Sequence, residues 1–157
     1  MRTAVLTIST SVSRRLSEDA SGPRLAELAE LAGAEVEAME VIPDDQALIE
    51  DRLHHYVDDD VRVILTTGGT GLTPDDVTPE ATRRVIERDA PGIAEALRAE
   101  SVRHTPMGVL SRGVAGTAGR TLIVNLPGSP RAIEQLFGVL APVLRHAADT
   151  LEGRSRH

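Results

Sequence analysis

The stretch Val61-Arg62-Val63-Ile64-Leu65-Thr66 runs directly into Thr67-Gly68-Gly69-Thr70-Gly71. The first six residues are mostly β-branched and apolar, which predicts a buried strand. The next five include three glycines and no large side chain, which predicts a loop that a ligand can approach closely. Pro79 then suits the first turn of a helix, which we expect to continue to about Asp89. The sequence therefore predicts a strand, a glycine loop and a helix in succession between residues 61 and 89.

The same alternation of strands and helices extends over the whole chain. Further strands are expected at residues 3–8, 35–41, 107–111 and 121–125. Further helices are expected at residues 25–33, 45–57, 93–102 and 131–151, and a loop at 9–23. Apolar strands alternating with helices are typical of an α/β protein in three layers, with helices on both faces of a mostly parallel sheet. We expect a single domain over residues 1–157, with 153–157 as a disordered tail.

The composition excludes several kinds of chemistry. The chain has no cysteine and a formal charge of −7, and all 17 of its basic residues are arginine. Without cysteine there is no disulfide or cysteine-bound zinc, and without lysine there is no Schiff base or Walker A loop. An acidic chain with one tyrosine and one phenylalanine argues against nucleic acid as a partner. No apolar run could span a membrane and no signal pattern precedes the first strand, so we expect a cytoplasmic protein.

Three of the predicted strands end in loops with small side chains. These loops begin at Ser9, at Thr67 and at Asn125, and they are rich in glycine, serine and threonine. In an open α/β sheet, ligands bind beyond the carboxyl ends of the strands. Such loops expose main-chain N–H groups, which favour anions and phosphates in particular. The sequence therefore predicts a phosphate-binding crevice at this edge of the sheet.

Carboxylates lie close to the glycine loop. Because bare acids would repel a phosphate, acids beside such a loop indicate a bridging magnesium ion. We expect Asp76 to be a metal ligand, with a helix cap as the alternative, and Asp75 to be a turn residue. Asp44 and Asp45 follow the strand at 35–41 in the same way. One of these two is expected to cap the next helix, and the other could be a second metal ligand.

A further candidate lies at Ser111-Arg112, before a glycine-rich stretch. Arginine can hold a phosphate through two hydrogen bonds, so Arg112 is a candidate phosphate ligand. The alternative is a solvated surface arginine. The five histidines show no metal-binding pattern, and the Gly-x-Ser-x-Gly motif of serine hydrolases is absent.

Together these motifs resemble the MogA/MoaB family of molybdenum cofactor biosynthesis. The resemblance rests on residues 66–71, 76–82, 110–112 and 125–130, and 19–23 and 42–45 also fit it in order. It covers about residues 3–151, and the same domain is similar to the G domain of gephyrin-type proteins. The family fold is the α/β arrangement expected above.

The resemblance also implies roles for individual residues. Asp44 and Asp76 match the family's catalytic, Mg²⁺-binding acids. Molybdopterin contacts map onto Thr67, Gly68, Gly69, Thr70, Gly71, Ser111, Arg112, Asn125, Pro127, Gly128 and Ser129. Nucleotide contacts map onto Ser9, Ser21 and Gly22. The chain departs from the family at Thr10, where many members carry an acid.

The activity implied by the resemblance is that of a molybdopterin adenylyltransferase. Such an enzyme transfers AMP from Mg-ATP to the terminal phosphate of molybdopterin and releases pyrophosphate. The implied partners are a MoeA-type metal insertase and further copies of the chain, in a homotrimer or homohexamer. The alternative function is a non-catalytic molybdopterin-binding carrier or scaffold.

Overall fold

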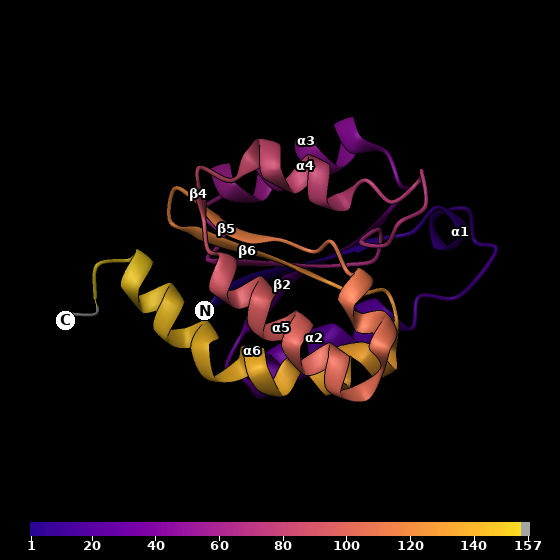
Figure 1. Ribbon diagram of the computed structural model, residues 1–157. Helices are drawn as coiled ribbons and strands as arrows, with labels where there is room; N and C mark the ends of the chain where they lie inside the picture. The colour runs from indigo at the N-terminus through magenta and orange to yellow at the C-terminus, as the bar shows by residue number, and fades with distance from the viewer. Residues whose placement is uncertain (155–157) are drawn as a thin grey trace.

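The computed structural model describes residues 1–154 and contains one six-stranded sheet in the order β2-β1-β3-β6-β5-β4 (Figure 1). Four strands run parallel: β1 (Arg2–Ile8), β2 (Glu35–Ile42), β3 (Val63–Thr67) and β6 (Thr121–Leu126). The short strands β5 (Ala115–Ala118) and β4 (Arg88–Asp89) extend the sheet in antiparallel pairing. The predicted α/β class with a mostly parallel sheet is confirmed.

Helices cover both faces of this sheet. Figure 1 shows α3 (Gln46–Asp58) and α4 (Thr78–Val85) on one face, with α2 (Ser21–Leu31), α5 (Pro91–His104) and α6 (Pro130–Leu151) on the other. The short helix α1 (Thr10–Ser13) follows β1, and a 3₁₀ helix, η1 (Pro106–Leu110), follows α5. These layers confirm the predicted three-layer arrangement.

The central strand β3 shows why its sequence is continuously apolar. Val63 and Leu65 pack into the core under α2 and α6, whereas Ile64 packs into the core under α3 and α4. All three side chains are fully buried. Because helices cover both faces, neither face of the strand can carry a solvated side chain.

Several predicted boundaries differ in the structure. Residues 107–111 were expected as a strand but form η1, where Thr105 caps the turn by accepting a hydrogen bond from the N–H of Met107 (3.3 Å). The helix starting near Pro79 ends at Val85 rather than Asp89, because Arg88–Asp89 pair with β5. The strand β5 lies in the glycine-rich stretch and was not predicted.

The expected loop at residues 9–23 also contains helical turns. The N–H of Val12 is capped by the hydroxyl of Ser9 (3.4 Å), which starts α1. Ser21 is already helical because the carboxylate of Asp19 accepts the N–H of Gly22 (2.9 Å) and so satisfies the start of α2. Most of the expected disordered tail, residues 155–157, lies outside the described residues. Within residues 1–154, no helix is both long enough and apolar enough to cross a membrane.

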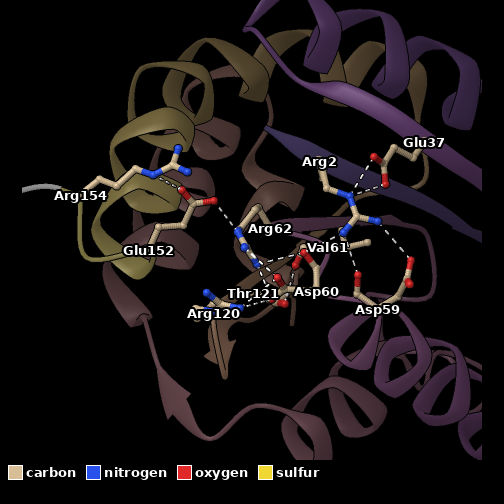
Figure 2. A network of polar contacts seen from close by, with 10 residues as sticks. All are labelled: Arg2, Glu37, Asp59, Asp60, Val61, Arg62, Arg120, Thr121, Glu152 and Arg154. Atoms are coloured by element: carbon tan, nitrogen blue, oxygen red, sulfur yellow. Dashed lines mark hydrogen bonds and ion pairs between the residues drawn. The ribbon is translucent and has the colours of Figure 1, made fainter.

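Ion pairs lie across the amino ends of the parallel strands. The glycine-rich loops lie at the opposite, carboxyl ends of these strands. Arg62 pairs with Asp60 (2.5 Å) and with Glu152 (2.5 Å), which lies at the end of α6 (Figure 2). Arg120 also pairs with Asp60 (3.0 Å), and Arg2 bonds the carboxylate of Glu37 (2.8 Å). The network therefore ties the last helix to the start of β3 and to the turn before β6.

Candidate active site

A cleft of about 440 Å³ lies where the parallel strands end. It brings together eight of the residues that the sequence analysis named as site candidates: Ser9, Ser21, Asp44, Thr67, Gly68, Gly69, Asp76 and Gly128. These residues follow four different strands and come together only in the fold. The location agrees with the rule that open α/β sheets bind ligands beyond the carboxyl ends of their strands.

The glycine loop forms the floor of the cleft. Gly68 has a φ of 97°, and its N–H donates to the carbonyl of Leu126 (3.1 Å). A Cβ at position 68 would lie 2.3 Å from the carbonyl oxygen of Ile8, so no larger residue fits there. In contrast, the N–H groups of Gly69, Thr70 and Gly71 donate to no acceptor among residues 1–154. Such consecutive N–H groups are suited to an anion.

Asp44 and Asp76 are held in the same way. Oδ2 of Asp44 accepts hydrogen bonds from the N–H (2.9 Å) and the hydroxyl (2.8 Å) of Thr10. Oδ2 of Asp76 accepts bonds from the N–H (3.0 Å) and the hydroxyl (2.8 Å) of Thr73. The Oδ1 atoms of both aspartates make no hydrogen bond within residues 1–154. Each acid therefore presents one oxygen that a ligand can use.

Asp45, the next residue after Asp44, caps a helix. Oδ1 of Asp45 accepts the N–H of Leu48 (2.9 Å) and caps α3. Asp45 is exposed and does not line the cleft, whereas Asp44 does. Of this pair, Asp45 is therefore the helix cap, and Asp44 is the one that lines the cleft.

This donor set suits magnesium. No three histidine, aspartate or glutamate side chains gather into a metal cage within residues 1–154. Magnesium does not need such a cage, because it usually takes one or two carboxylates and completes its shell with water and substrate phosphate. Asp44 and Asp76 would supply the two carboxylate oxygens, and the cation would neutralise phosphate charge in the cleft.

Asp19 also lines the cleft, although the sequence analysis did not name it as a site residue. Its Oδ2 accepts the hydroxyl of Thr7 (2.9 Å), and its Oδ1 accepts the N–H of Gly22. Asp19 therefore fixes the start of α2 beside the end of β1. The sequence offered one signal for this role. Asp19 precedes Gly22 by three residues, and an acid at this spacing can accept an N–H group in the first turn of a helix.

Arg112 holds the glycine loop and the segment after it through hydrogen bonds to their main-chain carbonyls. Its Nε donates to the carbonyl of Gly71 (2.7 Å), its Nη2 donates to the carbonyl of Asp76 (2.7 Å), and its guanidinium pairs with Glu80. The hydrogen bond from Arg112 holds the pKa of Glu80 below its usual range. With these donors occupied, Arg112 is arranged to hold the loop. Neither its position nor these contacts correspond to a solvated surface arginine.

Asn125 and Thr67 act from within the protein interior. Asn125 Nδ2 donates to the hydroxyls of Thr66 (2.9 Å) and Thr82 (3.0 Å), and its Oδ1 accepts the N–H of Val114 (3.2 Å). The hydroxyl of Thr67 donates to the carbonyl of Pro127 (2.8 Å). These side chains hold β3, β6 and the following turn together, and their polar atoms are already paired.

The remaining candidates are spread around the cleft. Ser111, Asn125 and Pro127 line a small separate cavity of about 30 Å³. Ser129 lines a third hollow of about 360 Å³ together with Arg131. Pro127, Gly128 and Ser129 thus face three different hollows in turn. Thr70, Gly71, Arg112 and Gly22 are not among the residues that line the cleft.

The fold and cleft define an open-sheet α/β protein with a cleft at the carboxyl ends of its parallel strands. The particular family follows from comparison with known proteins: a family model described as a probable molybdopterin binding domain matches residues 4–146, and the chain belongs to this family. The resemblance to MogA/MoaB proteins, and with it a place in molybdenum cofactor biosynthesis, is confirmed.

Individual relatives support this assignment. The chain is 36% identical over 152 residues to the molybdopterin adenylyltransferase of Helicobacter pylori strain J99, covering 95% of this chain and 86% of that protein. It is 42% identical to the molybdenum cofactor synthesis protein cinnamon of Drosophila melanogaster, over 91% of this chain but only 24% of that much longer protein. The crystal structure of the molybdopterin biosynthesis enzyme MoaB from Thermus thermophilus superposes with a TM-score of 0.91, at 42% identity and 98% coverage of both chains.

Proposed function

We propose that this chain is a molybdopterin adenylyltransferase, which transfers AMP from Mg-ATP to the terminal phosphate of molybdopterin. The observation that carries the proposal is a pair of aspartates that line one cleft near the glycine loop, each with an Oδ1 that makes no hydrogen bond within residues 1–154. The name of the Helicobacter pylori relative supports the same activity.

The reaction needs alignment and charge neutralisation rather than a protein nucleophile. An oxygen of the molybdopterin phosphate attacks the α-phosphorus of ATP, and the bond from that phosphorus to the bridging oxygen breaks, so that pyrophosphate leaves. The side chains that line the cleft include four acids and neither arginine nor histidine. Asp44 and Asp76 would hold a magnesium ion, which supplies positive charge to the triphosphate. The amides of residues 69–71 would hold phosphate oxygens.

The two substrates would occupy different sides of the cleft. Ser9 and Ser21, after the end of β1 and at the start of α2, would contact the nucleotide, and Gly22 would hold the start of α2 against Asp19. The glycine loop and Gly128 would contact molybdopterin, with Arg112 and Asn125 holding these segments in place. The product would pass to a metal insertase of the MoeA type, and the enzyme would act as a homotrimer or homohexamer.

The test is pyrophosphate release from Mg-ATP, with and without molybdopterin, by the wild type and by Asp76→Asn. We expect release that depends on molybdopterin and falls by about 100-fold or more in the variant, because one metal-binding oxygen loses its charge. Asp75→Asn is the matched control. Asp75 lies in the same loop, is exposed, and its carboxylate makes no hydrogen bond or ion pair within residues 1–154.

The outcomes separate the enzyme from a carrier. Wild-type release without any dependence on molybdopterin would overturn the proposed acceptor. No release, together with tight molybdopterin binding measured by fluorescence, would overturn the enzyme and favour the non-catalytic carrier. Equal losses in Asp75→Asn and Asp76→Asn would contradict the specific role of Asp76.

A further inference from the structure

We infer that Thr10 and Thr73 are positioning residues that fix Asp44 and Asp76 so that only Oδ1 of each aspartate binds the metal. This inference rests on the proposed function, because it concerns the same metal. Neither threonine touches the reacting atoms in this scheme. Each acts through the aspartate that it holds.

Thr10 forms a closed ring of hydrogen bonds with Asp44. The N–H and hydroxyl of Thr10 both donate to Oδ2 of Asp44, at 2.9 Å and 2.8 Å. The same hydroxyl oxygen accepts the main-chain N–H of Asp44 at 3.0 Å. Three hydrogen bonds therefore fix both the main chain and the side chain of Asp44 against the first residue of α1.

The ring determines which oxygen is available. Oδ2 already accepts two hydrogen bonds, whereas Oδ1 has no partner among residues 1–154 and lies over the glycine loop. A Cβ at Gly69 would come within 3.2 Å of this Oδ1. Because Mg²⁺ demands near-octahedral geometry and short bonds, a single oxygen held at a fixed direction suits it better than a freely rotating carboxylate.

Thr73 repeats two of these contacts on Asp76, at 3.0 Å and 2.8 Å, but in an exposed position. The contacts of Thr10 are half-buried. Water can replace a lost hydroxyl at an exposed site more readily than at a half-buried one. The two threonines should therefore contribute unequally, with Thr10 the stronger.

Binding of Mn²⁺, measured from its electron paramagnetic resonance signal with and without ATP, tests this inference directly. We expect Thr10→Val to weaken Mn²⁺ binding about 10-fold, as is typical when a group that orients a metal ligand is lost. Thr73→Val should weaken it by about 3-fold, because water replaces part of the contact. Thr10→Ser keeps the hydroxyl and should stay within about 2-fold of the wild type.

Thr3→Val is the matched control. Thr3 is a buried threonine of β1 whose hydroxyl donates to the carbonyl of Met1 (3.0 Å), at the other end of the strand. Its replacement also removes a hydroxyl hydrogen bond, and Mn²⁺ affinity should not change. Urea unfolding of each variant shows that the proteins compared are folded.

Wild-type affinity in Thr10→Val, or a loss in Thr10→Ser as large as in Thr10→Val, would overturn the inference. So would a wild type that binds no Mn²⁺ even with ATP present, since there would then be no metal for the threonines to orient. These readouts do not depend on AMP transfer. A chain that binds Mn²⁺ as expected but releases no pyrophosphate would contradict the proposed enzyme and leave the role of the threonines supported.

Discussion

Arg112 Nη2 donates a 2.7 Å hydrogen bond to the main-chain carbonyl of Asp76. The same side chain holds the carbonyl of Gly71 at the other end of the loop and pairs with Glu80 on α4. Its own N–H donates to the carbonyl of Thr70 (2.9 Å). One arginine therefore spans the segment that carries both the glycine loop and the proposed metal-binding acid.

The first prediction is that Arg112→Lys lowers pyrophosphate release by about 10-fold, because an ammonium cannot reproduce the rigid fork of donors. Steady-state assays at saturating Mg-ATP measure the effect. Arg83→Lys, an exposed arginine on α4, is the control and should not change the rate. A wild-type rate in Arg112→Lys would show that the loop keeps its geometry without the arginine fork.

The second prediction concerns Gly69. Its φ is 66°, and a Cβ there would lie 2.2 Å from the hydroxyl oxygen of Thr78. Gly69→Ala should therefore cost about 1–3 kcal/mol in the free energy of unfolding, measured with urea. Gly138→Ala on α6 should have the opposite sign, since its Cβ meets nothing within 4 Å and alanine favours a helix. Equal effects at both positions would argue against strain in the loop.

The third prediction uses the only tyrosine of the chain. Burial and then the hydrogen bond to Glu40 raise the pKa of Tyr56 from its ordinary 10.0 to about 12. Because the folded-state pKa is the higher one, this stabilisation is complete below pH 10 and is lost as the pH rises through about 12.

Tyrosinate absorbance reports this titration without interference from a second tyrosine. The native midpoint should lie near pH 12 and fall towards 10.0 in urea. Glu40→Gln should lower the native midpoint, because the carboxylate favours the neutral phenol. Glu37→Gln, on the same strand but paired with Arg2, should leave it unchanged. An unchanged native midpoint in Glu40→Gln would contradict the contact with Glu40, and a wild-type midpoint at the ordinary value would also contradict the burial of the ring.

The fourth prediction compares two arginines of the ion-pair network in Figure 2. The side chain of Arg62 is 13% exposed and pairs with Asp60 and Glu152, whereas that of Arg120 is 58% exposed. Arg62→Leu should lower the free energy of unfolding by about 2 kcal/mol, because the mostly buried carboxylate of Glu152 would keep only the exposed Arg154 as a partner. Arg120→Leu should change it by less than about 1 kcal/mol. Urea unfolding measures both, and similar losses would contradict the role of burial.

The sequence predicted the central strands well because β1, β3 and β6 are buried on both faces and so read as continuous apolar runs. It failed at η1, where Met107 and Val109 are apolar but exposed. An apolar pattern alone does not distinguish a covered strand from an uncovered turn. The strand β5 was missed because alanine, glycine and threonine carry little strand signal, and its pairing with β4 and β6 decides the outcome.

The candidate site was only partly predictable for a similar reason. The sequence placed acids and glycines after the right strands, and strand topology does bring them into one cleft. It could not separate Asp44 from Asp45, since only the start of α3 shows which carboxylate caps the helix. The sequence also could not predict these contacts of Arg112 and Asn125, because the partners are distant along the chain. Glu80 lies 32 residues from Arg112. Thr82 and Thr66 lie 43 and 59 residues from Asn125.

The ion pairs lie at the amino ends of the parallel strands and the cleft lies at their carboxyl ends. Because the two sites are separated in this way, each can be engineered without changing the other. Variation at Arg120, Asp60 and Arg154 alters side chains at the amino ends of the strands, a full strand length from the acids of the cleft. A library restricted to these amino ends can therefore be screened for heat tolerance without changing any side chain that lines the cleft. Changes to the loops at the carboxyl ends can then be introduced into a more stable variant, which better tolerates the strain of altered loops.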